Sequence, residues 1–208
     1  MKKLLFLALF LVVNSLLDSC ATDDFFDFDL ELTDANNVTM KRFEVMQSGD
    51  TVAVTDYAIG LLGTAEIQLS GVSGGFGGRL MADAAYGLAD PVSGISITST
   101  ADLGSAYPAG SELKSIFEVQ EVQPNCIGNP TALSDCVTNY SSFDFINSLE
   151  EGFNDRLAPG FVEREGSLFL LKLTPTGNLS AGKRSFTVIF RFQSGKTVPL
   201  ITPDVFIE

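Results

Sequence analysis

The stretch Phe-Thr-Val-Ile-Phe-Arg-Phe at residues 186–192 places an apolar side chain at every second position. A period of two is the pattern of a β-strand with one buried face. Ser194-Gly195 then marks a turn, a second strand is expected at 197–201, and a last short one at 205–207. The end of the chain therefore predicts β structure.

The same period appears near the start, where Phe26, Phe28, Leu30 and Leu32 alternate with acidic residues. This pattern predicts a half-buried strand whose solvent face is acidic. Further strands are expected at 43–46, 51–54, 58–69, 95–98, 116–120, 161–164 and 167–173. The first two flank a turn at 47–50 and are expected to form a hairpin with each other.

One helix is expected, near 142–152. Ser141 and Asp144 resemble a capping box, and Gly152 marks the stop. Many short strands, glycine-rich turns and a single short α-helix predict a mainly β fold, a β-sandwich of immunoglobulin-like or related type.

The first residues have the order of an export signal. Lys2 and Lys3 precede an apolar run at 4–13, too short for a membrane core that needs about 20 residues. Residues 17–20 resemble a bacterial lipobox, which implies cleavage before Cys20 and lipid on its thiol and new amino group. The expected organisation is a signal peptide at 1–19, a short acidic tether at 20–25 and one β-rich domain at 26–208.

Asp23 and Asp24 allow three interpretations. With Phe25 they resemble the acidic signal that exports Bacteroidetes lipoproteins to the cell surface, which we favour over a merely solvated tether. Calcium binding by these and the following aspartates ranks lowest, because no D-x-[DN]-x-[DN]-G loop occurs. No metal site is predicted.

Residues 93–117, with the later stretches LFLLKL and FTVIFRFQSGK, resemble a family of uncharacterised Bacteroidetes lipoproteins. The resemblance covers about half of the mature chain by pattern. It implies a lipoprotein with a β-rich fold, and no activity.

The chain has three cysteines. If Cys20 carries lipid, Cys126 and Cys136 remain, and in an exported protein they are expected to form a disulfide that closes a short loop. Two free thiols are the alternative.

The amino-acid composition excludes several kinds of catalytic and metal site and disfavours one class of partner. Histidine is absent, which excludes Ser-His-Asp and Cys-His catalysis and histidine-ligated zinc. The net charge is −13, and it becomes −14 once the signal peptide leaves with two cationic residues and one acidic residue. Such a charge disfavours nucleic acid as a partner.

Glu150 with Glu151, and Glu163 with Glu165, could serve a glycosidase, but adjacent carboxylates are usually just solvated.

Thr51 lies in Asp50-Thr51-Val52, which resembles a Bacteroidetes O-glycosylation sequon.

The expected function is a non-enzymatic binding or accessory module on the outer membrane, facing outward, with the periplasmic face as the alternative. Its partners would be the membrane, through the lipid, and a protein or glycan; no cofactor is expected. The alternatives are a carboxylate-dependent hydrolase of glycan or peptide, and a structural subunit that pairs through an edge strand such as the C-terminal one.

Overall fold

The computed structural model describes residues 25–67, 85–128, 133–139, 149–154, 168–174 and 179–208. Its strands are β1 (Phe25–Thr39), β2 (Glu44–Val45), β3 (Thr51–Val52), β4 (Tyr57–Ile67), β5 (Ala85–Leu88), β6 (Val92–Ser99), β7 (Phe117–Val122), β8 (Val137–Asn139), β9 (Leu168–Leu173), β10 (Gly182–Arg184), β11 (Phe186–Phe192), β12 (Thr197–Ile201) and β13 (Val205–Ile207). The helices are η1 (Val54–Asp56), η2 (Lys114–Ile116), η3 (Pro124–Cys126), α2 (Leu133–Cys136) and α3 (Leu149–Gly152).

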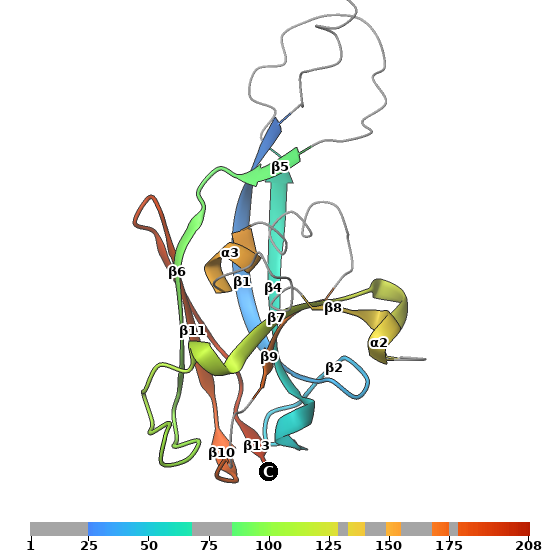
Figure 1. Ribbon diagram of the computed structural model, residues 1–208, viewed down its shortest axis with the longest axis vertical. Coiled ribbons are helices and arrows are strands. Elements are labelled where there is room, and N and C mark those ends of the chain that lie inside the picture. The colour runs from blue at the N-terminus through green and yellow to red at the C-terminus, as the bar shows by residue number, and fades with distance from the viewer. Residues whose placement is uncertain (1–24, 68–84, 129–132, 140–148, 155–167, 175–178) are drawn as a thin grey trace, which may run out of the picture.

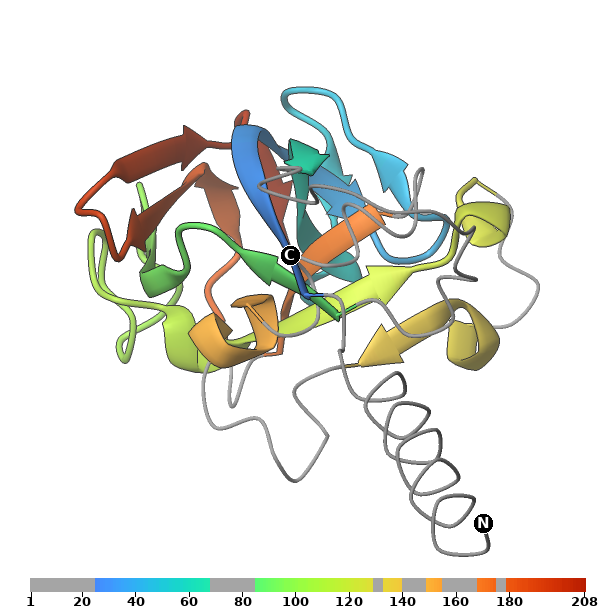
Figure 2. The ribbon, with the colours of Figure 1, turned by 90° about the horizontal axis from the view of Figure 1, so that it is seen from above.

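The strands form a mainly β sandwich (Figures 1 and 2), as predicted. The larger sheet has the order β2-β1-β4-β9-β7-β8, with β5 beside β1. A sheet of β12-β11-β6 packs its apolar face against this larger sheet, and a small sheet of β10-β13-β3 pairs the C-terminal strand with the early strand β3. The fold class expected from the alternating strands is confirmed.

The core forms where β11 faces the larger sheet. Phe186, Val188 and Phe190 are fully buried, as their two-residue period predicts. The Phe186 ring stacks on Tyr57, with 5.2 Å between ring centroids, and meets Phe117 edge-on at 5.9 Å. These contacts join strands from both sheets, so Phe186 lies at the centre of the sandwich.

β1 confirms the acidic strand and extends it. It starts at Phe25, one residue before the predicted start, and runs to Thr39. Phe28, Leu30 and Leu32 are buried, while the acidic residues between them are exposed. A bulge between Leu32 and Asp34 shifts the register against β4, and the strand continues beyond it.

The predicted hairpin between 43–46 and 51–54 is wrong. The turn forms, since the amide of Gln47 donates to Asp50 Oδ2 at 2.8 Å. However, β2 pairs with β1, and β3 pairs in parallel with β13. A turn signal specifies only a reversal of the chain, and here more distant strands supply the hydrogen-bonding partners. By contrast, the hairpin of β11 and β12 forms as expected.

The C-terminal strand is not an edge. β13 lies between β10 and β3, and both of its edges are hydrogen-bonded. The expectation that this strand offers an exposed edge for assembly is therefore wrong.

Helical structure matches the prediction in part. α3 covers the last turn of the predicted 142–152 helix, and Phe153 after it packs on Phe190 with 5.0 Å between ring centroids. Residues 140–148, with Ser141 and Asp144, lie outside the described residues. The short helix α2 was not predicted.

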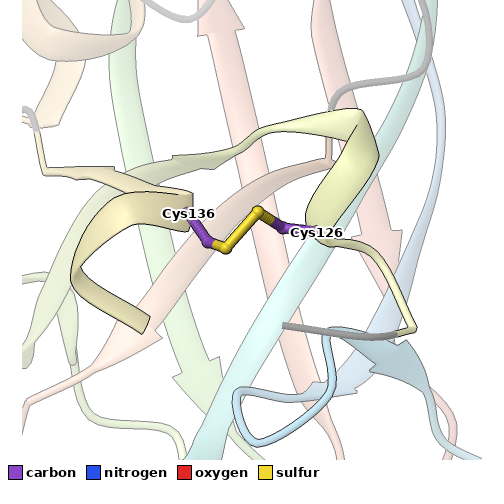
Figure 3. Close-up of a disulfide and its surroundings, with 2 residues drawn as sticks. All are labelled: Cys126 and Cys136. Carbon is purple, nitrogen blue, oxygen red and sulfur yellow. A yellow bond between two sulfur atoms is a disulfide. The ribbon is translucent and has the colours of Figure 1, made fainter. Parts of the chain in front are cut away.

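A disulfide joins Cys126 and Cys136, the predicted pair (Figure 3). Cys126 ends η3 and Cys136 ends α2, so the bond ties together two short helical turns that lie within the connection between β7 and β8. Both cysteines are buried in a small second core on the outer face of the larger sheet. That core also contains Val38, Met40, Phe43, Ala58, Val122 and Leu170.

Candidate functional site

A groove of about 520 Å³ opens at the edge of β1. It is lined by Asp29, Leu30, Glu31, Thr64, Glu66, Asp90, Phe192 and Lys196. Its size lies within the range of about 300–1,000 Å³ that is typical of ligand sites. Four of its eight lining residues carry carboxylates, so the groove concentrates the negative charge of an acidic protein.

Two neighbouring strands place three of these carboxylates on the outer face of the larger sheet. Asp29 of β1 lies directly opposite Glu66 of β4, and Glu31 lies opposite Thr64. Like charges directly opposite each other on a sheet destabilise it. Asp29 and Glu66 thus place two carboxylates side by side in this part of the groove, which suits a cationic ligand.

The opposite wall comes from the turn between β11 and β12. Lys196 Nζ lies 5.6 Å from the centroid of the Phe192 ring, a cation–π contact. Asp90 accepts hydrogen bonds from the amide and the hydroxyl of Ser194. The Ser194 hydroxyl bond is the main cause of the lowered pKa of Asp90. Gly195 has a φ of 90°, which glycine adopts without strain, so the wall is held by both the turn and Asp90.

The edge of β1 inside the groove has no neighbouring strand in the part of the chain that the structure describes. β5 pairs with β1 at Phe25–Phe28, and β2 pairs with it at Val38–Thr39. At the far end, the carbonyl of Asn37 accepts from the amide of Met46 at 2.8 Å. Leu30 therefore lies in a gap between two paired stretches of the same edge.

The edge of β6 that faces away from β11 differs from the edge of β1, because side chains form hydrogen bonds with its main-chain groups. Asn154 bonds both the amide and the carbonyl of Val92, at 2.8 Å each. Glu150 accepts from the amide of Ile95, and Glu112 from that of Ile97. These contacts satisfy an edge that could otherwise pair with another chain.

In the part of the chain that the structure describes, Glu150 therefore has a structural role. Besides capping Ile95, it forms an ion pair of 2.8 Å with Lys114. Its neighbour Glu151 also lies in α3, whereas Glu163 and Glu165 lie outside the described residues. The structure does not bring Glu150 into the acidic groove.

The capping carboxylates predict a loss of stability in acid. Burial raises the pKa of Glu112, but hydrogen bonds from Ile97, Ser96 and the following amides outweigh it, and the pKa lies below its ordinary value. Burial also raises the pKa of Glu150, but the hydrogen bonds from Lys114 and from the amide of Ile95 lower it by more. The pKa of Glu150 therefore also lies below its ordinary value. Groups with a lowered folded pKa stabilise the fold above their unfolded pKa of about 4.3, and this contribution disappears as pH falls through the folded pKa.

We expect the urea midpoint of the wild type to fall between pH 7 and pH 3.5 by more than that of an E112Q/E150Q variant. At pH 7 the variant should be less stable, since a neutral acceptor bonds an amide more weakly than a charged one by about 1 kcal/mol. Glu44→Gln, on exposed β2, is the matched control and should follow the wild type. Parallel pH profiles for the wild type and the double variant would contradict this assignment.

The other predicted site residues have separate places. Cys20, Asp23 and Asp24 lie outside the described residues, as do the signal peptide and residues 20–24 of the tether. Thr51 is the first residue of β3 and its side chain is exposed. Within the described ranges there is no cluster of three or more acidic, cysteine or histidine side chains that could hold a metal ion. No described helix is long and apolar enough to cross a membrane.

No known family model matches the chain, and no curated protein is significantly similar to it. The resemblance to Bacteroidetes lipoproteins therefore remains a prediction. Sequence reasoning identified the acidic face with Asp29 and Glu31, but it missed Glu66, Asp90 and Lys196. Their only local signal was charge, and it is the pairing of distant strands that brings them together.

Proposed function

We propose that the protein is a lipid-anchored binding module of the outer membrane, displayed on the cell surface, and that its groove binds a cationic ligand. The observation that carries this proposal is the groove itself, where Asp29, Glu31, Glu66 and Asp90 line one cavity with an aromatic ring at its wall. Binding needs no reaction, so the protein acts as a non-enzymatic accessory component.

The lipobox resemblance at Cys20 supports the anchor. Each lipid CH₂ that enters the bilayer contributes about 0.8 kcal/mol, and two or more chains hold a protein stably. Asp29 is nine residues from Cys20 and can therefore lie at most about 30 Å from the anchor along the chain. A groove so close to the membrane suits a partner that is itself at the membrane surface.

Electrostatics support the class of ligand. The groove carries four carboxylates against the single cation Lys196, and a cleft in which one sign of charge dominates raises the local concentration of the opposite charge and speeds association. The net charge of −13 adds to this field at long range. We therefore favour a basic segment of a protein over a neutral glycan, and Thr51, exposed on β3, is a separate proposed site of O-glycosylation.

Binding to intact cells tests the location and the groove together. Cells that produce the full chain should bind a fluorescent pentalysine peptide more strongly than cells that produce an E31Q/E66Q variant, by about tenfold in affinity for two lost ion pairs at the surface. Glu44→Gln removes an exposed carboxylate outside the groove and should behave as the wild type. A C20A chain should leave the cell-bound fraction.

The outcomes separate the parts of the proposal. Equal binding by both kinds of cell, with a difference between the purified proteins, would contradict display on the cell surface. Equal binding by the purified proteins would contradict the groove as the site. A C20A chain that stays with the membranes would contradict lipid anchoring at this cysteine.

A further inference from the structure

On the basis of the proposed function, we propose that the ligand is an extended polypeptide segment with basic residues at alternating positions. It adds as a short strand to the edge of β1 between β5 and β2. The extended conformation, the alternation of basic residues and the mode of binding do not follow from the charge of the groove alone.

The main chain of β1 can hydrogen-bond an added strand at Leu30. The carbonyl of Phe28 accepts from the amide of Ala89 on the β5 side. Residues two apart in a strand direct their amide and carbonyl groups to the same edge, so those of Leu30 face the groove. Leu30 lines the groove, and no described strand pairs with β1 there. An extended peptide can supply the missing ladder bonds.

The side chains on the outer face of β1 favour basic residues in the added strand. A strand added beside β1 would place every second residue on the outer face, about 4.5–5.5 Å from the side chains opposite. Asp29 and Glu31 both occupy this outer face, with the buried Leu30 between them in the sequence. Lysine or arginine at two positions separated by one residue would meet both carboxylates, and Glu66 adds to the field from β4. The residue between them would point inward, toward the side of Phe192.

The open stretch of β1 sets the length of the added strand. From Asp29 to Asp34 the edge spans about 17 Å at roughly 3.3 Å per residue. Beyond that, the amide of Ala35 is already bonded to Asp34 Oδ1 at 2.8 Å, and the carbonyl of Asn37 accepts from the amide of Met46. The site therefore accepts a strand of about five residues, which is enough for two outward-facing basic side chains.

The two edges of the β12-β11-β6 sheet are less receptive. Side chains cap β6 at Val92, Ile95 and Ile97. Pro199 interrupts β12 and has no amide hydrogen to donate. The gap in β1 is thus favoured by its open main chain as well as by its charge.

The test uses the purified full chain and three pentapeptides with blocked ends. One has lysine at positions two and four with valine between them and threonine at each end. The second has the same composition with the two lysines adjacent, and the third is the first peptide with its central amide N-methylated. Affinity is measured by calorimetry at low salt for the wild type, for E31Q/E66Q and for E44Q.

We expect the alternating peptide to bind the wild type at least tenfold more tightly than either altered peptide. E31Q/E66Q should lose at least tenfold in affinity for it, and E44Q should not change. Equal affinity of all three peptides, still weakened by E31Q/E66Q, would overturn strand addition but leave the acidic groove intact as a site for cationic ligands. Binding that is absent, or that E31Q/E66Q does not weaken, would overturn the proposed function as well.

Discussion

Replacing Phe186 with alanine is expected to destabilise the protein by about 4 kcal/mol, because a fully buried phenylalanine leaves a cavity that its surroundings fill only in part. Phe186 is 0% exposed, and its ring contacts Tyr57 and Phe117. Its loss would therefore remove ring contacts that join the two sheets. Urea unfolding followed by far-UV circular dichroism measures the change.

Phe206→Ala is the matched control. Phe206 lies on β13 and is 37% exposed, so the same truncation should cost about 1 kcal/mol. If F186A were as stable as F206A, Phe186 would not lie at the centre of the core and the packing of β11 on the larger sheet would be wrong.

Removing the disulfide is expected to cost about 3 kcal/mol. Cys126 and Cys136 are 10 residues apart, and loop-closure entropy for a ring of this size gives a value close to that. Both cysteines are buried in the small second core. We expect the C126A/C136A variant to unfold at lower urea concentration, while the native circular dichroism spectrum remains mainly β.

Reduction provides a control without a change of sequence. The wild type in excess dithiothreitol should approach the stability of C126A/C136A, and the reductant should leave the double variant unchanged. Oxidised wild type, unfolded in urea, should expose no thiol from Cys126 or Cys136. Two titratable thiols from these positions, or an unfolding midpoint that does not depend on the disulfide, would contradict the role assigned to it.

The strands could be predicted because each has a local signal. In β11 the alternation of Phe186 to Phe192 follows directly from one buried and one more polar face. In β1 the alternating aspartates identify the solvent face before any partner strand is known. The disulfide followed from a count of cysteines once Cys20 was assigned to lipid.

The partners of the strands could not be predicted in the same way. β2 and β3 flank a real turn, yet they pair with β1 and β13, which lie elsewhere in the chain. The groove has the same origin. Asp90 and Lys196 join Asp29 only because the turn after β11 lies beside β1, and no local pattern specifies that contact.

The most direct test of the central claim is amide hydrogen exchange at Leu30, measured by NMR on the full chain with and without the alternating lysine peptide. An amide in an open edge exchanges readily, whereas one bonded to an added strand is protected. We predict that exchange at Leu30 slows at least tenfold at saturating peptide, while exchange at Glu44 is unchanged. Bound peptide with no change in exchange at Leu30 would contradict the assignment of this edge as the binding site.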